Sequence, residues 1–324
     1  MSGRHEKETQ LKQMIQKRLN DVPNVVEEYY YSLIGSGKSY ETAYRYINYV
    51  ISFLNFTFKG KYTENFYANV KPIHINKYIT SLRTKEVNGK TERTSDSIKS
   101  VQWSALNSFF QFLVPEYITT NPVVNTSRPK MKDKPKVTYL TSDEITKMLL
   151  KVETEAHEKF KNRDLCILKL GFSTGLRVSA IVQIDVDDID FKNNCISVTE
   201  KGDYDDRIMF GENLKNQLLL WLEDREKYFD HSDTDALFVS QFGKRLGDDA
   251  ISNLLKKYAK GITGKKVTPH VMRHTCATNL YEKTGDIYLT SRQLRHKSVT
   301  VTQRYAEISE EKQKAAINVL DNLI

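Results

Sequence analysis

Six side chains in the second half of the chain have the types and spacing needed for chemistry on a phosphodiester. They are two arginines, a lysine, two histidines and a tyrosine: Arg177, Lys201, His270, Arg273, His296 and Tyr305. The first arginine closes a Thr-Gly-Leu-Arg segment, and the second follows the first histidine by three residues. The tyrosine follows the last histidine by nine residues. Each piece is ambiguous alone, so the interpretation depends on the whole set and its order.

Cutting a phosphodiester needs an oxygen nucleophile, stabilisation of extra negative charge at phosphorus, and a proton for the leaving oxygen. The guanidinium groups of Arg177 and Arg273 can each form a bidentate fork onto phosphate oxygens. Both are therefore predicted to stabilise the transition state. Tyr305 is the predicted nucleophile. Since the unperturbed pKa of tyrosine is about 10, its hydroxyl needs help to lose a proton, which adjacent cations and His270 as a base can give.

More ordinary roles are open to each of these side chains. Tyr305 is one of 18 tyrosines, and the two arginines could be ion-pair partners in a helical core. Lys201 falls in a polar turn, where lysines are usually solvated, and Lys192 and Lys215 are near. His274 is expected to pack or to bond to the backbone. The catalytic interpretation is favoured because the residues occur together and in order.

This order and spacing strongly resembles the tyrosine recombinase (phage integrase) family, including its Xer/integrase-like members. That family has an arginine in a T-G-L-R segment, a lysine in a β-hairpin, an H-x-x-R pair, a later histidine or tryptophan, and a nucleophilic tyrosine nine residues beyond. All six positions are filled, and the resemblance covers about Thr141 to Glu311. It implies that Lys201 protonates the departing 5′ oxygen and that His296 donates a hydrogen bond to a phosphate oxygen. The implied intermediate is a 3′-phosphotyrosine, on a path through a Holliday junction.

The resemblance also implies how the protein is organised. An N-terminal helical core-binding bundle and an α+β catalytic domain would grip the two faces of a duplex. The expected partner is double-stranded DNA with short inverted-repeat sites, bound by a homotetramer. The C-terminal segment, Ser309 to Ile324, is expected to dock on a neighbouring subunit, the alternative being packing on its own domain. No cofactor is expected, since the exchange keeps the phosphoester bond energy, and no carboxylate cluster resembles a two-metal nuclease site.

Two positions depart from the family pattern. An acidic residue is usual three positions after the first arginine, but here that residue is Ala180. Support for the arginines is then expected from elsewhere, with Asp185 and Asp187 as candidates. The glycine that usually precedes the last histidine is replaced by Arg295. If that position demands φ > 0, the arginine is strained; alternatively, it adds a phosphate contact.

The first part of the chain, to about Pro122, is predicted to be a bundle of four or five helices with no strong strand signal. Ser39 to Phe58 carries an apolar stripe at three- and four-residue spacing, with Ser39 as its N-cap. Ser95 to Leu113 continues the pattern. Lys85 to Thr94 is polar and is predicted to be a loop. The bundle is expected to start by about Val25, with no obvious additional arm-binding domain before it.

Three segments are predicted: a helical DNA core-binding domain at 1–126, a basic, proline-containing linker at 127–138, and a catalytic domain at 139–324. Thr141-Ser-Asp-Glu opens the catalytic domain as a capping box. Apolar alternation on both sides of the polar stretch Glu200 to Arg207 predicts a small antiparallel sheet with a hairpin. The remainder is predicted to be helical, with caps at Thr268 and Gly285. The expected fold class is mainly α with this small sheet.

Composition fits a nucleic-acid partner. A net charge of +8 and a pI of about 9.1 favour a polyanion, with expected phosphate contacts from Lys99, Arg128, Lys130 and Arg295. No stretch approaches the roughly 20 apolar residues of a membrane span. Three separated cysteines fit a reducing compartment and show no metal-ligand spacing. The predicted location is therefore the cytoplasm, in association with the nucleoid.

Two other functions remain open at this point. A type IB topoisomerase shares the chemistry but would relax supercoils as a monomer without site preference. A DNA-binding protein that has lost catalysis is motivated by Ala180. Within recombinases, integration or excision of a mobile element and resolution of DNA multimers look alike in sequence.

Overall fold

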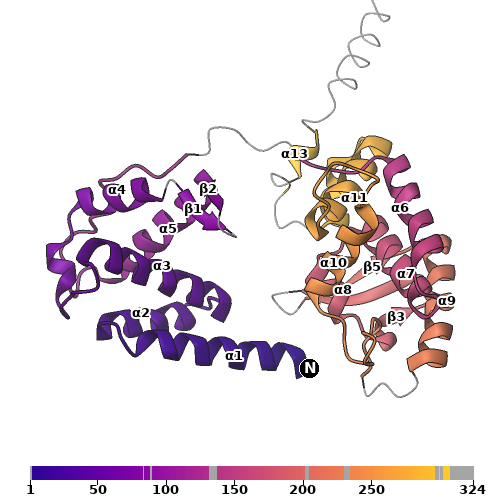
Figure 1. The fold of residues 1–324 in the computed structure, drawn as a ribbon, viewed down its shortest axis with the longest axis horizontal. Helices are drawn as coiled ribbons and strands as arrows, with labels where there is room; N and C mark the ends of the chain where they lie inside the picture. The colour runs from indigo at the N-terminus through magenta and orange to yellow at the C-terminus, as the bar shows by residue number, and fades with distance from the viewer. Residues whose placement is uncertain are drawn as a thin grey trace, which may run out of the picture. The chain divides into compact units, whose positions relative to one another are not determined.

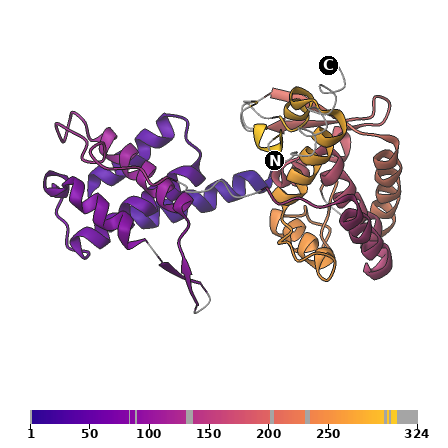
Figure 2. The same cartoon turned by 90° about the horizontal axis from the view of Figure 1, so that it is seen from above.

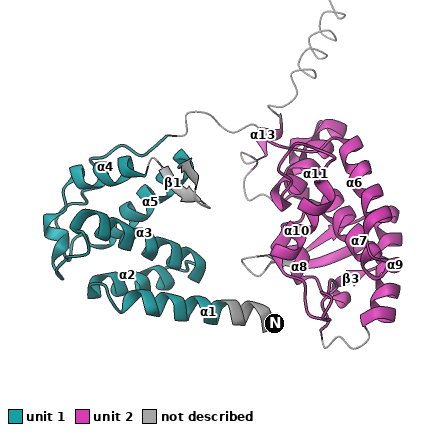
Figure 3. Ribbon diagram, viewed as in Figure 1, with its two compact units in different colours: residues 1–135 teal, residues 136–324 magenta. Residues whose placement is uncertain are grey.

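The computed structural model is predominantly helical, with a small three-stranded sheet, which confirms the predicted fold class (Figure 1). It describes residues 2–82, 84–87, 90–130, 137–200, 204–229, 234–295, 299 and 302–306. The chain divides into two compact units, residues 1–135 and 136–324 (Figure 3). Each unit has its own hydrophobic core. Within the described ranges, no helix is long and apolar enough to cross a membrane.

The first unit is a helical bundle built around α3. Its elements are α1 (Ser2–Leu19), α2 (Asn24–Gly35), α3 (Tyr40–Phe58), η1 (Phe66–Asn69), α4 (Pro72–Ser81), β1 (Thr84–Val87), β2 (Lys90–Arg93) and α5 (Asp96–Phe112). Helix α3 contacts α1, α2, α4 and α5. The predicted N-cap of α3 is confirmed, because the Ser39 side chain accepts a hydrogen bond from the backbone N–H of Thr42. Phe53 of α3 packs edge-on against Phe110 of α5 in the shared core.

The loop predicted at Lys85 to Thr94 was wrong, because most of this stretch forms a hairpin. Strands β1 and β2 are antiparallel, with Val87 opposite Lys90, and the hairpin extends from the bundle in Figure 2. Two residues, Asn88 and Gly89, separate the strands in sequence. Since Asn-Gly is the dipeptide most typical of a two-residue hairpin turn, the signal was present, but the polar composition of the strands obscured it.

The bundle was expected to start by about Val25, and helix α1 already belongs to it. Ile15 and Leu19 of α1 are buried in the same core as α3. They lie four residues apart and so share one face of the helix. These two buried side chains pack α1 against the core of the bundle. The rest of the helix is polar, so its apolar periodicity in the sequence is weak.

In its described residues, the second unit begins with three α-helices and a small sheet and continues with five α-helices. Its elements are α6 (Ser142–Glu155), α7 (Glu158–Thr174), α8 (Val178–Gln183), η2 (Val186–Asp188), β3 (Ile189–Asp190), β4 (Cys195–Glu200), β5 (Tyr204–Met209), α9 (Glu212–Phe229), α10 (Asp248–Ala259), α11 (Pro269–Thr284), α12 (Ile287–Gln293) and α13 (Gln303–Ala306). The predicted hairpin is confirmed: β4 pairs with β5 in antiparallel register, and β3 pairs with the other edge of β4.

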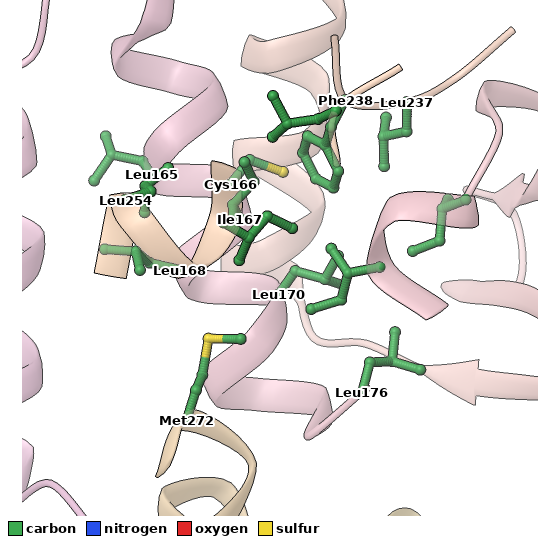
Figure 4. Close-up of a cluster of buried hydrophobic side chains, with 14 of the residues drawn as sticks. Leu165, Cys166, Ile167, Leu168, Leu170, Leu176, Leu237, Phe238, Leu254 and Met272 are labelled. Carbon is green, nitrogen blue, oxygen red and sulfur yellow. The ribbon is translucent and has the colours of Figure 1, made fainter. Parts of the chain in front are cut away.

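Helix α7 runs through the core of this unit and contacts α6, α8, α9, α10 and α11. Cys166, Ile167, Leu168 and Leu170 are fully buried along it (Figure 4). Helix α11 reaches this core through Met272, which lies against α7 at Gly171. A Cβ atom at residue 171 would be 2.2 Å from the Met272 thioether. The missing side chain of the glycine therefore lets α11 approach α7 closely.

The predicted caps of this unit are confirmed. Thr141 and Glu144 form a reciprocal capping box at the start of α6. Burial acts to raise the pKa of Glu144, but hydrogen bonds from Lys265 and from the backbone N–H of Thr141 outweigh it and hold that pKa at about 2.

Thr268 caps α11 through the N–H of Val271, and the left-handed residue Gly285 ends the helix. These caps fix where the helix that carries His270 and Arg273 begins and ends.

Candidate active site

Tyr305 lies on the short helix α13, and its side chain is only 2% exposed. The ring packs with Ala277 and Leu294 in a small apolar cluster that is separate from the main core. Its hydroxyl oxygen is 2.7 Å from Nδ1 of His274, within hydrogen-bond distance. The apolar contacts therefore fix the position of the ring, and the hydroxyl lies against the imidazole of His274.

The Arg273 side chain is buried, at 6% exposure, and is anchored by backbone carbonyl groups. Nη1 donates to the carbonyl oxygen of Gly175 at 2.7 Å, and Nη2 donates to the carbonyl oxygen of Leu294. One acceptor follows α7 and the other follows α12. The guanidinium therefore links α11 to the ends of α7 and α12, and two separate hydrogen bonds fix its orientation.

Gly175 needs to be glycine for two reasons. Its φ is +65°, a left-handed conformation that side chains rarely adopt. A Cβ atom there would lie 2.7 Å from Cδ2 of Leu294 and 3.1 Å from Sγ of Cys276. The tight turn after α7 thus aims its carbonyl at Arg273 while α11 and the end of α12 pack closely beside it.

Arg177 and His270 lie on the same segments as these groups. Arg177 is half-buried at the N-cap position of α8, two residues after Gly175. The turn before it is fixed by Thr174, whose hydroxyl donates to Leu170 O and accepts from the N–H of Leu176. His270 is exposed in the first turn of α11, at three residues before Arg273.

Arg295 has a φ of +52°, so the condition raised from the sequence, a left-handed backbone at this position, is met. Its backbone N–H bonds the carbonyl of Arg292 at the end of α12. Because Leu294 directly precedes it, the turn at Arg295 shapes the path of the chain where the Leu294 carbonyl meets Arg273. The position therefore matters to the site through its backbone.

His274 was expected to pack or to bond to the backbone; its ring does pack against that of Tyr305, but its Nδ1 also lies within hydrogen-bond distance of the Tyr305 hydroxyl, which was not expected. A signal existed: His274 follows His270 by four residues and so shares its face of α11. What the sequence could not supply was the position of α13 against that face. Helices α11 and α13 are in contact.

The other predicted residues are placed unevenly. Lys201 and His296 lie outside the described residues. In sequence, Lys201 falls between Glu200 of β4 and Tyr204 of β5, which are paired. Asp185 pairs closely with Arg245, and the described bonds of Arg273 go to two backbone carbonyls. Asp187 is exposed. The C-terminal segment from Ser309 also lies outside the described residues.

The proposed phosphate contacts of the first unit differ in accessibility. Lys99 pairs with Asp96 at 3.1 Å, and its side chain is only 13% exposed. Arg128 is exposed, donates to the hydroxyl of Ser100 and lies over the ring of Trp103. Lys130 is exposed. Arg128 and Lys130 are thus better placed than Lys99 to meet a polyanion.

The thiol beside the site is suited to packing. Burial raises the pKa of Cys276 to about 12, although the nearby Arg273 cation acts to lower it. Its Sγ lies 3.5 Å from the carbonyl oxygen of Ser173. Among the described residues, no group of His, Cys, Asp or Glu side chains could hold a metal ion.

Gly175→Ala is expected to destabilise the chain by about 1–3 kcal/mol, from the positive φ and from crowding against Leu294. It is also expected to slow DNA cleavage at least tenfold, since both carbonyls that hold Arg273 would shift. Melting curves and a single-turnover cleavage assay measure these effects. Gly285→Ala is the matched control, because Gly285 has a φ of +68° but no atom within 4 Å of an added Cβ. Equal cleavage by the two variants would contradict the positioning role.

Comparison with known proteins gives matches along most of the chain. Residues 138–312, more than half of the sequence, match the model of the phage integrase family. Tyrosine recombinase XerS of Streptococcus thermophilus is 29% identical, over 93% of this chain and 96% of its own. A crystal structure of XerH site-specific recombinase, in a post-cleavage complex with palindromic difH substrate, has a TM-score of 0.73 at 22% identity, over 88% and 81% of the chains. A lambda integrase tetramer bound to a Holliday junction has a TM-score of 0.65 at 18% identity, over 87% and 76%.

Proposed function

We propose, from the premise that this chain belongs to the phage integrase family and is a site-specific tyrosine recombinase, that Tyr305 is its nucleophile. The hydroxyl oxygen attacks the scissile phosphorus, a bond from tyrosine oxygen to phosphorus forms, and the bond from phosphorus to the 5′ oxygen breaks. The product is a 3′-phosphotyrosyl link and a free 5′ hydroxyl. Attack by another 5′ hydroxyl reverses these steps and joins a new strand, so no external energy source is needed.

The observation that carries this proposal is the setting of Tyr305: its hydroxyl bonds His274, the residue after the anchored Arg273, and its ring packs on Leu294, whose carbonyl accepts from that arginine. Residues from the turn after α7, from α11, from the end of α12 and from α13 converge there. A fixed guanidinium in a buried setting stabilises developing phosphoryl charge well, because it needs no reorganisation during the reaction. Arg273 and Arg177 are proposed to clamp the phosphate. His270 is proposed to face it from the exposed first turn of α11.

Lys201 and His296 complete the proposed set. Lys201 donates a proton to the departing 5′ oxygen, and His296 donates a hydrogen bond to a phosphate oxygen. These assignments are supported by the family motif and by the strands that flank Lys201.

The proposed substrate is double-stranded DNA with short inverted-repeat sites, recombined by a homotetramer through a Holliday junction. The net charge of +8 supports binding to DNA, and the lambda integrase tetramer on a Holliday junction supports the assembly. Residues 1–126 are proposed to bind core DNA, 127–138 to link, and 139–324 to catalyse, with the segment from Ser309 docking on a neighbour. Phosphate contacts are assigned to Lys99, Arg128, Lys130 and Arg295. The proposed location is the cytoplasm, at the nucleoid.

A nicked suicide substrate tests the proposal. Footprinting on DNA that flanks the gene locates the site, and a nick beside the scissile phosphate lets the cleaved fragment diffuse away so that the covalent adduct accumulates. After nuclease and trypsin digestion, the nucleotide is expected on peptide 305–312, or on 298–312 if the adduct blocks cleavage after Arg304. Tyr305 is the sole tyrosine in either peptide.

Two outcomes would contradict the proposal. The first is an adduct that maps to a different residue, or no adduct on any protected sequence. The second is relaxation of arbitrary supercoiled plasmids by the monomer, which would indicate a topoisomerase.

A further inference from the structure

We infer that His274, which the family motif does not include among its six positions, is a catalytic residue that exchanges the hydroxyl proton of Tyr305. The inference rests on the proposed role of Tyr305 as nucleophile and deepens it. Nδ1 of His274 lies 2.7 Å from the reacting oxygen, within hydrogen-bond distance. It assigns the proton transfer to the residue after Arg273 and not to His270, which was the base expected from the sequence.

The surroundings favour His274 for this task. The Tyr305 ring is 2% exposed, so bulk water has little access to its hydroxyl. His274 is half-buried on α11, and the two rings lie 5.7 Å apart and tilted by 56°. His270 is exposed one turn earlier. A proton that leaves a buried hydroxyl needs an acceptor already in contact with it, and His274 meets that condition.

The chemistry of the exchange balances. A neutral imidazole with its proton on Nε2 accepts a hydrogen bond at Nδ1. As the bond from Tyr305 oxygen to phosphorus forms, the O–H bond breaks and the proton moves to Nδ1, while the leaving 5′ oxygen takes a proton from Lys201. In the rejoining step, the attacking 5′ hydroxyl gives its proton to the neutral amine of Lys201, and the imidazolium returns its proton to the departing tyrosine oxygen. One histidine thus acts as base in cleavage and as acid in rejoining.

His274→Asn and His274→Gln separate proton exchange from positioning. Asparagine places an amide close to the position of Nδ1, so it can keep the hydrogen bond, and glutamine places its amide nearer to that of Nε2. Neither amide can hold the proton. Both variants are expected to form the adduct about 10²–10³ times more slowly than the wild type, with unchanged DNA binding in a gel shift. His157→Asn, a change to an exposed histidine in the same unit, is the matched control and is expected to leave the rate within about threefold.

A second substrate identifies the side of the reaction on which His274 acts. A 5′-bridging phosphorothiolate has a sulfur leaving group that departs without a proton. It is expected to restore the rate of Lys201→Ala and to leave the defects of both His274 variants in place. A structural role would instead lower the melting temperature, and both variants would then cleave at the wild-type rate at temperatures where they stay folded.

Four results overturn the inference. A wild-type rate for His274→Asn excludes proton exchange, and rescue of that variant by the phosphorothiolate moves His274 to the leaving-group side. Faster cleavage by His274→Ala shows a restraint on the nucleophile in place of catalysis. Absence of an adduct with the wild type overturns the proposed function, and the inference with it, whereas the first three results leave the proposed function intact.

Discussion

Replacing Tyr305 with phenylalanine is expected to reduce the covalent DNA adduct below detection, equivalent to cleavage at least about 10⁴ times slower. The variant keeps the ring that packs against Ala277 and Leu294 and loses only the oxygen that meets His274. The loss of one hydrogen bond is expected to cost about 1–2 kcal/mol of folding stability. DNA binding should therefore persist, and a gel shift beside the suicide-substrate assay measures both properties.

Tyr258→Phe is the matched control for this prediction. Tyr258 is fully buried in the same unit, and its hydroxyl donates to Asp164 at 2.8 Å. The change removes a buried hydroxyl of the same kind and is expected to destabilise the chain by about 1–3 kcal/mol. Adduct formation should continue below the lowered melting temperature. Residual adduct with Tyr305→Phe, at a level close to that of the control, would mean that another residue is the nucleophile.

Arg273→Lys is expected to slow cleavage by about 10³, even though the positive charge is kept. The planar guanidinium donates to two carbonyls in different directions, from Gly175 and Leu294. A lysine ammonium is a compact point charge that cannot reproduce this fork and hold a phosphate in a fixed orientation at the same time. Single-turnover cleavage measures the effect, and DNA affinity is expected to change by less than about tenfold.

Arg225→Lys controls for the loss of an arginine fork as such. Arg225 also donates to two backbone carbonyls, those of Ala236 at 3.0 Å and Thr234 at 2.6 Å, away from the candidate site. Its replacement should lower stability without slowing cleavage at temperatures where the fold persists. If Arg273→Lys cleaves as fast as Arg225→Lys, then the guanidinium at 273 acts only in folding.

Much of the site could be predicted from the sequence because the reaction restricts which residue types can perform it. The spacing of Arg177, Arg273 and Tyr305 indicated one phosphodiester chemistry. In the structure, Arg273 and Tyr305 both contact Leu294, one through its carbonyl and the other through its side chain. The capping residue Thr141 and the β4–β5 hairpin were also predicted correctly from the sequence. Both depend on contacts between neighbours in sequence, which short-range patterns encode.

The remaining features depend on contacts between distant segments. The role of His274 required the position of α13 against α11, which no local pattern specifies. With alanine at residue 180, support for the arginines was expected from another acidic side chain. Arg273 instead donates to the backbone carbonyls of Gly175 and Leu294. Every residue type has a backbone carbonyl, so the sequence does not show which carbonyls bind the arginine.

The anchoring of Arg273 by main-chain carbonyls has a consequence for how this protein tolerates mutation. Every residue type supplies a carbonyl, so the support of the arginine does not depend on keeping a particular functional group at residue 294. It depends on the path of the backbone at two left-handed residues, Gly175 and Arg295. The two described carbonyl anchors of Arg273 are thus preserved by chain geometry at two turns, and not by the residue type that supplies each carbonyl.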